Sequence, residues 1–323
     1  MMLVGNERNQ QYLLRAMNAG VLAHAYLLSG PASVGKRTLA LAVAGRLLCE
    51  SPNIKRLDAC GACRACELAR AGTHPDIVFL SRESRLATDA EKRGPPAGRA
   101  GIGIGDIHEL RERVSRTPWS GKRIIAVIDG VEALSPDAKT ALLKTLEEPG
   151  ANVIFFLITD AAGAVLPTIR SRAVPLHFAF VSDAELAPLL AGVSVAWQKE
   201  YLAFANGRPG VIVRMLNDGA FRASFREDRE RFETLRHAGL AEHFAFSDRE
   251  AKEPGRLEAY LSFLLERGHA ALPTAPPGER ERIGAILRSA LRTLALVRGT
   301  TVNRRLAADS FFFELSGLSA PPR

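Results

Sequence analysis

The first 180 residues alternate short apolar runs with longer amphipathic segments. The short runs are rich in β-branched and aromatic residues, as buried strands are, and they are 'AYLLS' (25–29), 'DIVFL' (76–80), 'RIIAVID' (123–129), 'NVIFFLIT' (152–159) and 'VPLHF' (174–178). Apolar residues recur at helical spacing in the segments 36–48, 104–116, 136–148 with Ser135 as N-cap, and 166–171. Because strands alternate with helices, we predict an α/β fold with a parallel sheet and helices on both faces.

Strand patterns end after Phe180, and the remaining chain is helical in pattern. A capping box of Ser182 and Glu185 opens a helix over 182–190, and helical runs follow around 197–205 and 209–217. From about residue 220, amphipathic segments are separated by Gly/Pro breaks such as 'LPTAPPGE'. We therefore predict three domains, over 1–179, 180–218 and 219–323, of which the second and third are helical.

Residues 81–105 are rich in Gly, Pro and Arg and lack an apolar period, which predicts a mobile loop. The loop ends in 'GIGIG', but no strand leads directly into these glycines and their spacing differs from that of a dinucleotide-binding turn. We interpret them as loop glycines.

Composition excludes several classes of protein. The chain has 323 residues, of which 47 % are hydrophobic and 24 % charged, as in ordinary soluble proteins. It has neither an apolar run of about 20 residues nor a signal-peptide pattern, so we expect no membrane contact and a cytoplasmic location. The net charge of +8 permits nucleic-acid binding, but without a dense basic tract it is equally explained by an arginine-rich composition.

The stretch 'SGPASVGKRTLA' nearly matches the phosphate-binding pattern G-x-x-x-x-G-K-[ST]. Gly30, Gly35 and Lys36 fit the pattern, and a strand precedes them while a helix follows. Arg37 stands where a hydroxyl should ligate Mg²⁺, and Thr38 lies about 100° further around the helix. We predict a P-loop that can hold phosphate but lacks its usual magnesium ligand.

A carboxylate at the end of a neighbouring strand gives a second test. Asp129 ends 'RIIAVID', where it can hold a magnesium-bound water or, alternatively, cap a turn. Gly130 follows it and has no carboxylate to polarise an attacking water, and we expect Glu132 to be aimed elsewhere. We also include Thr159, at the end of 'NVIFFLIT', among the residues of the nucleotide site.

The four cysteines lie within residues 49–66 in the pattern C-x10-C-x2-C-x2-C. Four thiolates, Cys49, Cys60, Cys63 and Cys66, can form a closed tetrahedral shell around a structural Zn²⁺. The alternatives are reduced free thiols, or a redox pair that would leave two cysteines unexplained. Without an export signal, a disulfide framework is not expected.

Together these segments resemble the bacterial DNA polymerase III clamp-loader ATPases of the AAA+ class. The similarity lies in 'HAYLLSGPASVGKRTLA', the four-cysteine insert, 'IIAVIDGVEALSPDAKTALLKTLEEPGANVIFFLIT' and 'LPTIRSRA', and it is strong over residues 10–215. It implies an AAA+ domain, a small helical lid (180–218) and a helical collar (219–323) in a hetero-pentameric ring. The implied partners are the gamma/tau and delta subunits and, through the complex, the sliding clamp and primer-template DNA.

Three departures indicate which branch of this family the chain resembles. Motor subunits carry a hydroxyl, a carboxylate and a lid arginine where this chain has Arg37, Gly130 and, in 'NGRPG', Gly210. The segments 'GKRT' and 'GTHPDIVFL' are similar to the delta-prime branch. The resemblance therefore implies a non-hydrolysing, stator-like subunit that contains structural zinc and holds ATP or ADP without turnover.

One catalytic element of the family is retained. Its Ser-Arg-Cys motif, which extends an arginine into the nucleotide site of the neighbouring subunit, reads Ser171-Arg172-Ala173 here. The resemblance implies that Arg172 is an arginine finger that acts in trans, whereas we expect Arg170 to be a surface residue. Two alternatives stay open: a gamma/tau-like ATPase that uses Thr38 and Glu132 as substitutes, and a stand-alone zinc-containing DNA-binding module.

Overall fold

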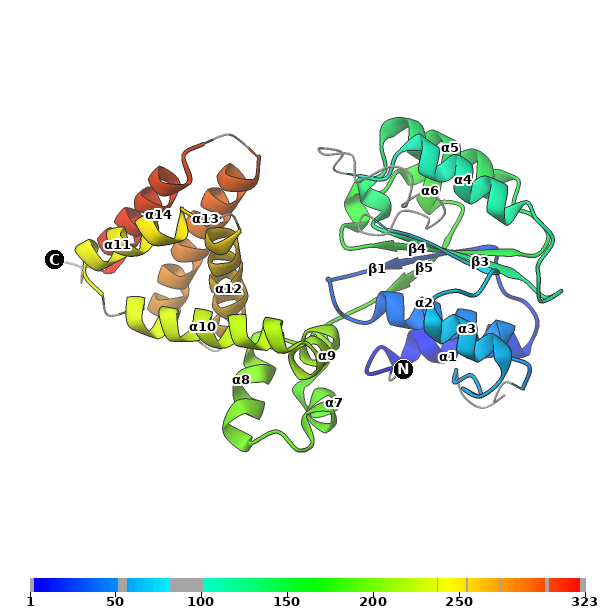
Figure 1. Ribbon diagram of the computed structural model, residues 1–323, viewed down its shortest axis with the longest axis horizontal. Helices are drawn as coiled ribbons and strands as arrows, with labels where there is room; N and C mark the ends of the chain where they lie inside the picture. Colours follow the sequence, from blue (N-terminus) through cyan, green and yellow to red (C-terminus); the bar gives the residue numbers. More distant parts are fainter. Residues whose placement is uncertain are drawn as a thin grey trace. The chain divides into compact units, whose positions relative to one another are not determined.

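The computed structural model describes residues 3–51, 57–81, 101–236, 238–253, 255–272, 275–299 and 302–319. The chain divides into two compact units, Met1–Glu185 and Leu186–Arg323, and each is described by itself (Figure 1). The first unit contains the predicted α/β domain. The finer division of the second unit near residue 218 stays a prediction.

A five-stranded parallel sheet forms the centre of the first unit within its described residues. The strand order is β2-β3-β4-β1-β5, and every pair is parallel. The strands are β1 (Ala25–Ser29), β2 (Ile77–Ser81), β3 (Ile124–Asp129), β4 (Val153–Thr159) and β5 (Val174–His177). All five predicted strands are present, with ends that differ by a residue or less, so the predicted fold class is confirmed.

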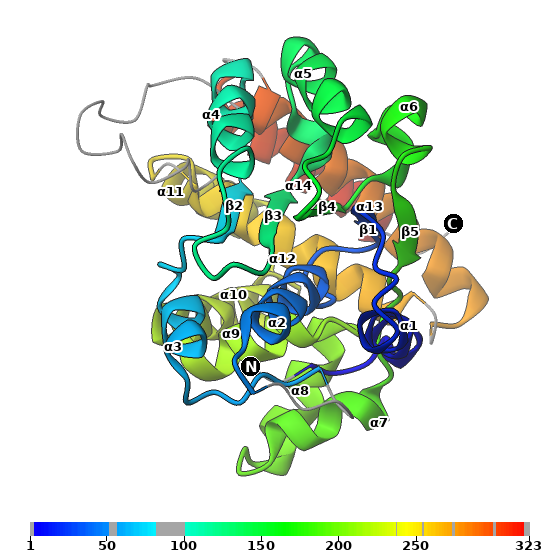
Figure 2. The ribbon, with the colours of Figure 1, turned by 90° about the vertical axis from the view of Figure 1, so that its right-hand side faces the viewer.

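Helices cover both faces of this sheet (Figure 2). On one face lie α1 (Glu7–Asn18), α2 (Lys36–Leu48) and α3 (Arg64–Ala71), and on the other α4 (Ile104–Val114), α5 (Pro136–Glu147) and α6 (Pro167–Arg170). Successive strand residues point to opposite faces, so Phe155 and Leu157 enter one apolar core while Phe156 and Ile158 enter the other. Burial on both faces explains why the strands are apolar throughout.

The polarity of the sheet places the ends of three strands together. Ser29 of β1 pairs with Thr159 of β4, and Asp129 of β3 pairs with Ile158 of the same strand. The P-loop after β1 therefore lies at the same sheet edge as Asp129 and Thr159. Open parallel sheets bind ligands at this carboxyl-terminal edge.

Most helix predictions hold for this unit, and two helices were not predicted. Ser135 caps α5 as expected, because its Oγ accepts a hydrogen bond from the Ala138 N–H at 3.2 Å. The helices α1 and α3 had no predicted counterpart. Most of the predicted 81–105 loop lies outside the described residues. Its last glycines start α4, where the Gly103 N–H donates to Asp106 Oδ2 at 2.7 Å.

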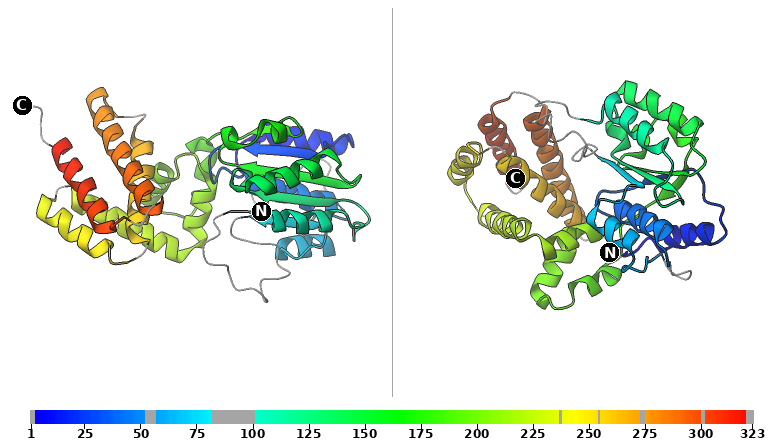
Figure 3. Two further views of the ribbon diagram at one scale, coloured as in Figure 1. Left: turned by 90° about the horizontal axis from the view of Figure 1, so that it is seen from above. Right: turned by 45° about the vertical axis from the view of Figure 1, so that its right-hand side comes forward.

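The second unit is helical, as predicted (Figure 3). The predicted capping box is present, with Ser182 Oγ donating to Glu185 Oε2 at 2.6 Å, although the helix it opens is short and continues as a 3₁₀ turn, Ala187–Leu190. No helix in the described parts of the chain is long and apolar enough to cross a membrane. The helices are α7 (Asp183–Leu186, at the junction), α8 (Val195–Ala205), α9 (Pro209–Asn217), α10 (Gly219–Arg236), α11 (Leu240–Glu250), α12 (Arg256–Ala271), α13 (Pro277–Gly299) and α14 (Arg304–Ser319).

Candidate functional site

The P-loop turns sharply from β1 into α2. Gly35 is the residue before the helix and has a φ of 98°, in the left-handed region that glycine adopts without strain. The helix begins at Lys36, so its first backbone N–H groups, which have no partner within the helix, point toward the turn. This arrangement is suited to bind an anion.

Lys36 is almost completely buried in this turn, with 4 % of the residue exposed. Its Nζ donates to the Gly30 carbonyl at 2.7 Å, to the Pro31 carbonyl, and to Asp160 Oδ1 at 2.8 Å. An ammonium group has three donors, and all three are used. Sequence reasoning missed Asp160, although an acidic residue directly after a buried strand was a signal that could have identified it.

Arg37 is exposed in the first turn of α2, and its side chain extends over strand β2. Its guanidinium carbon is 4.1 Å from the centroid of the Phe79 ring on β2, within the range of a cation–π interaction. Thr38 is the next residue and is only partly exposed. Phe79 was not predicted as a site residue, and its position in a strand gave no signal for this contact.

Asp129 and Gly130 end the neighbouring strand β3. Burial raises the pKa of Asp129 above its usual value, and the positive charge of Arg37 acts against this shift. Gly130 has a φ of 93°, so a larger residue here would be strained. Glu132 lies in the 3₁₀ turn Val131–Ala133 that follows. The strand end thus provides one carboxylate, and its next backbone position favours glycine.

Thr159 lies at the same edge but has a local bonding partner. Its side chain is buried, and Oγ1 accepts a hydrogen bond from the Ala161 N–H at 3.0 Å. The hydroxyl therefore stabilises the turn after β4, in which Asp160 lies. The structure brings together at one sheet edge Gly30, Gly35, Lys36, Arg37, Thr38, Asp129 and Thr159. That they bind nucleotide stays a prediction. Gly210 lies in α9 of the second unit, and its proposed correspondence to a lid arginine stays a prediction.

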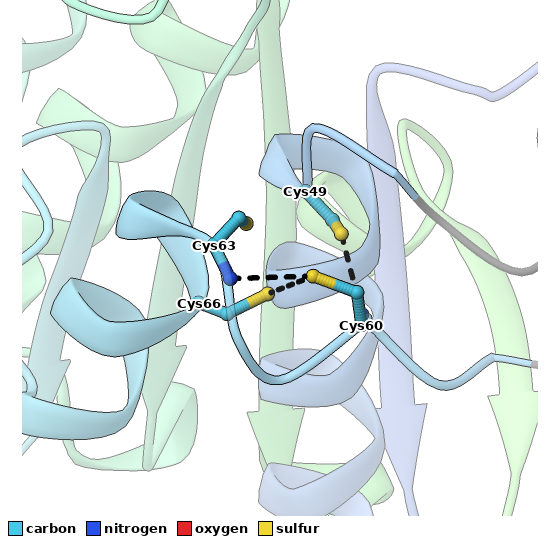
Figure 4. Close-up of side chains that lie close together, drawn as sticks. All are labelled: Cys49, Cys60, Cys63 and Cys66. Carbon is cyan, nitrogen blue, oxygen red and sulfur yellow. Dashed lines mark hydrogen bonds between the residues drawn. The ribbon is translucent and has the colours of Figure 1, made fainter.

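The four cysteines form one cluster between the end of α2 and the start of α3 (Figure 4). Their sulfur atoms all lie within 4.8 Å of one another, and the Cys60 and Cys66 sulfurs are 3.9 Å apart. Four sulfurs at about 2.3 Å from a tetrahedral metal ion would be about 3.8 Å apart. The cluster could therefore bind a metal ion with little rearrangement.

Backbone groups around the cluster favour thiolates. The Cys60 N–H donates to Cys49 Sγ at 3.3 Å, and the Cys63 N–H donates to Cys60 Sγ at 3.4 Å. Backbone N–H groups of Glu50 and Cys66 lower the pKa of Cys63 to about 6, whereas burial raises the pKa of Cys66 to about 12. Lys122 holds the carboxyl-terminal end of α2 in place, because its Nζ donates to the carbonyl of Cys49, the residue that follows this helix, at 2.7 Å.

Arg172 lies just beyond the short helix α6 and has an ordered set of partners. Its Nη2 donates to Glu147 Oε1 at 2.7 Å, and its Nη1 donates to the Thr168 carbonyl at 3.0 Å and to Ser171 Oγ at 3.3 Å. About a third of the side chain is exposed (35 %). Ala173, next to it, is buried in the core, so a small residue fits there. Glu147, in 'LLKTLEEP', was not predicted as its partner.

The sheet places Arg172 and the cysteines away from the P-loop. Arg172 lies two residues before β5 and binds Glu147. Lys122 lies two residues before β3 and donates to the Cys49 carbonyl, so the cysteine cluster also lies toward the amino-terminal edge of the strands. The P-loop follows the carboxyl end of β1. Helix α2, with 13 residues, runs about 20 Å from the P-loop to Cys49. The predicted site residues therefore form three separate groups.

Comparison with known proteins identifies the family. The family model described as DNA polymerase III, delta subunit, matches residues 5–182, which is more than half of the 323 residues. The chain belongs to this family. The predicted resemblance to the DNA polymerase III clamp-loader subunits is confirmed.

Individual relatives agree with this assignment. The chain is 38 % identical over 201 residues to DNA polymerase III subunit delta' of Pseudomonas aeruginosa, covering 61 % of this chain and 57 % of that protein. It is 32 % identical over 185 residues to the delta' subunit of Escherichia coli, covering 57 % and 48 %, and 32 % identical over 192 residues to subunit gamma/tau of Mycobacterium tuberculosis, covering 59 % and 30 %. The matches span about half to three fifths of the length of the delta' relatives.

A solved structure supports the fold. The chain is similar to a DNA polymerase III gamma subunit-related protein from Thermotoga maritima, with a TM-score of 0.53 and 14 % sequence identity, over 95 % of this chain and 99 % of that one. At this identity the similarity shows the fold alone. It agrees with the expected α/β domain followed by helices.

The raised pKa of Asp129 leads to a prediction about stability. Because the pKa is higher in the folded than in the unfolded chain, the ionised carboxylate disfavours folding at neutral pH. We expect Asp129→Asn to raise the free energy of unfolding at pH 7. The gain should shrink as the pH falls through the folded-state pKa and vanish below the ordinary value of 3.8, where the wild-type group is protonated in both states.

Urea unfolding measures this effect, with Trp119 fluorescence as the probe of the first unit in a Trp197→Phe background. The exposed carboxylate in Asp183→Asn serves as the control and should show a much smaller gain. A loss of stability in Asp129→Asn at pH 7 would contradict the prediction, because it would mean that attraction to Arg37 outweighs the cost of burial.

Proposed function

We propose that this chain is a non-hydrolysing, delta-prime-type subunit of the DNA polymerase III clamp loader that supplies Arg172 to the nucleotide site of a neighbouring subunit. The observation that carries the proposal is the position of Arg172. It precedes β5 at the amino-terminal edge of the sheet, whereas the chain's own P-loop lies at the carboxyl-terminal edge. Arg172 is thus poorly placed for its own P-loop but can reach a second subunit.

The contacts of Arg172 support this role. Hydrogen bonds to Glu147, Thr168 and Ser171 hold the guanidinium while part of it stays exposed. A phosphate oxygen in the neighbouring site can replace the Glu147 carboxylate, because Arg binds both anions through the same planar set of donors. Ser171 takes part by fixing the arginine rather than by touching nucleotide.

The P-loop of this chain supports binding more than turnover. Gly35 and Lys36 provide the usual turn and positive charge, but Arg37 offers no ligand for a metal ion. Gly130 takes a backbone conformation that disfavours the carboxylate needed to activate water. We infer that the chain holds ATP or ADP without hydrolysing it and serves as a fixed part of the ring.

The partners follow from the family. The relatives are named as delta' and gamma/tau subunits of DNA polymerase III. On this basis we propose that the chain assembles with gamma/tau and delta subunits in a ring of five. The complex would load the sliding clamp onto primer-template DNA in the cytoplasm, with the second unit contributing a lid and a collar.

The cysteine cluster is proposed as a structural zinc site. Cys49, Cys60, Cys63 and Cys66 supply four thiolates with no position left for water or substrate, as in closed zinc sites. The cluster lies at the sheet edge away from the P-loop, so a catalytic role for the metal is not supported. Zinc would join the end of α2 to the start of α3 and fix the segment between them.

The first test removes the proposed arginine finger. Arg172→Ala in the reconstituted loader should lower DNA-stimulated ATP hydrolysis severalfold or more, because an arginine finger is worth roughly 10³–10⁵ in rate at the site it serves. Arg170→Ala is the matched control, since Arg170 is exposed and lies two residues earlier. The ATPase rate is measured after gel filtration has verified that both complexes assemble. An undiminished rate with Arg172→Ala would remove the proposed role.

The second test concerns zinc. We expect about one zinc per purified chain by elemental analysis. Cys60→Ser should lose the metal and unfold at a lower temperature, because it removes a ligand without opening a cavity in the core: Cys60 is the exposed member of the cluster. Ala62→Ser, in the same loop, should keep both the zinc and the melting temperature. If the purified wild-type protein contains no zinc and keeps its full stability in a chelator, the assignment is refuted.

A further inference from the structure

The position of Arg37 is unsuited to the magnesium ion that accompanies nucleotide in most P-loops. Mg²⁺ requires oxygen ligands in near-octahedral geometry at about 2.0–2.1 Å, whereas a guanidinium has only donors. The nearest hydroxyl, Thr38, lies about 100° further around α2. The residues present therefore do not fit a magnesium ion held through the P-loop.

The Arg37 side chain is instead held in place by the sheet. Its guanidinium carbon lies 4.1 Å from the ring centroid of Phe79. Phe79 is two residues before Ser81, the end of β2, and Ser81 pairs in register with Asp129. The ring thus positions the guanidinium over the strand next to the carboxylate that would otherwise bind metal.

The contact with Phe79 brings the charge of Arg37 near this carboxylate, because Phe79 pairs in register with Val127, two residues before Asp129 on the neighbouring strand. A fixed positive charge therefore already acts on Asp129, and it repels a divalent cation at short range. The same fixed charge attracts the phosphates of a nucleotide.

We propose that this P-loop binds a nucleoside diphosphate or triphosphate without a divalent cation, and that Arg37 supplies the positive charge and donors that Mg²⁺ supplies elsewhere. The inference rests on nucleotide binding at this P-loop and is independent of the role of Arg172. The remaining donors are Lys36 and the first backbone N–H groups of α2. When nucleotide binds, a phosphate oxygen replaces the Asp160 carboxylate as the anion that pairs with the Lys36 ammonium. The ammonium is therefore paired with an anion before and after binding.

Isothermal titration calorimetry of the full chain with ADP and with ATP, in a buffer made without Mg²⁺ or chelator and in Mg²⁺, tests the proposal; leaving out the chelator keeps any zinc on the cysteine cluster. The wild-type dissociation constant should be the same in both buffers within about threefold. Arg37→Ser should weaken binding without Mg²⁺ by about tenfold or more, because charge-assisted hydrogen bonds to phosphate are lost. In Mg²⁺ this variant should recover affinity, since a serine hydroxyl and Asp129 can then ligate the ion.

Arg15→Ser is the matched control, because it removes the same charge from an exposed position on α1 of the same unit. Its affinity should equal that of the wild type in both buffers. Wild-type binding that needs Mg²⁺, or Arg37→Ser binding without Mg²⁺ as tightly as the wild type, overturns the inference and leaves nucleotide binding itself intact. Absence of binding in both buffers overturns nucleotide binding at this P-loop together with the inference, while the proposal for Arg172 still stands.

Discussion

The common direction of the five strands is the constraint on which the rest of the structure depends. In a parallel sheet all carboxyl ends lie at one edge, which gathers the P-loop, Asp129 and Thr159. The same constraint sends the residues that precede each strand to the other edge, where Arg172 and the cysteines lie. The sheet therefore keeps the P-loop and Arg172 apart, as the proposed action of Arg172 on a neighbouring subunit requires.

Charges at the P-loop balance one another within the chain. Lys36 pairs with Asp160, and Arg37 lies over Phe79 where its charge acts on Asp129. A phosphate-binding turn normally leaves such positive charges to be compensated by the phosphates of a nucleotide. Here the protein supplies most of this compensation itself. A stable P-loop without turnover is therefore compatible with an ordinary, well-packed α/β domain.

The sequence predicted the elements better than the partners of the site residues. The strands were evident because each is apolar on both faces, and α2 followed from the P-loop pattern. Helix α1, 'ERNQQYLLRAMN', was missed because it is largely polar, and α3 because it is short and directly follows Cys63. Asp160 lies 124 positions from its partner Lys36, and Phe79 lies 42 positions from Arg37. Glu147 lies 25 positions from Arg172. Only tertiary packing brings these pairs together.

We propose that this chain does not hydrolyse ATP by itself. Steady-state ATP hydrolysis by the purified chain in Mg²⁺, compared with Lys36→Ala, tests it most directly. We expect a rate that is indistinguishable between the two proteins, because both have Gly130 where a carboxylate would activate water. Measurable hydrolysis that Lys36→Ala abolishes would contradict it and would make the chain a motor subunit.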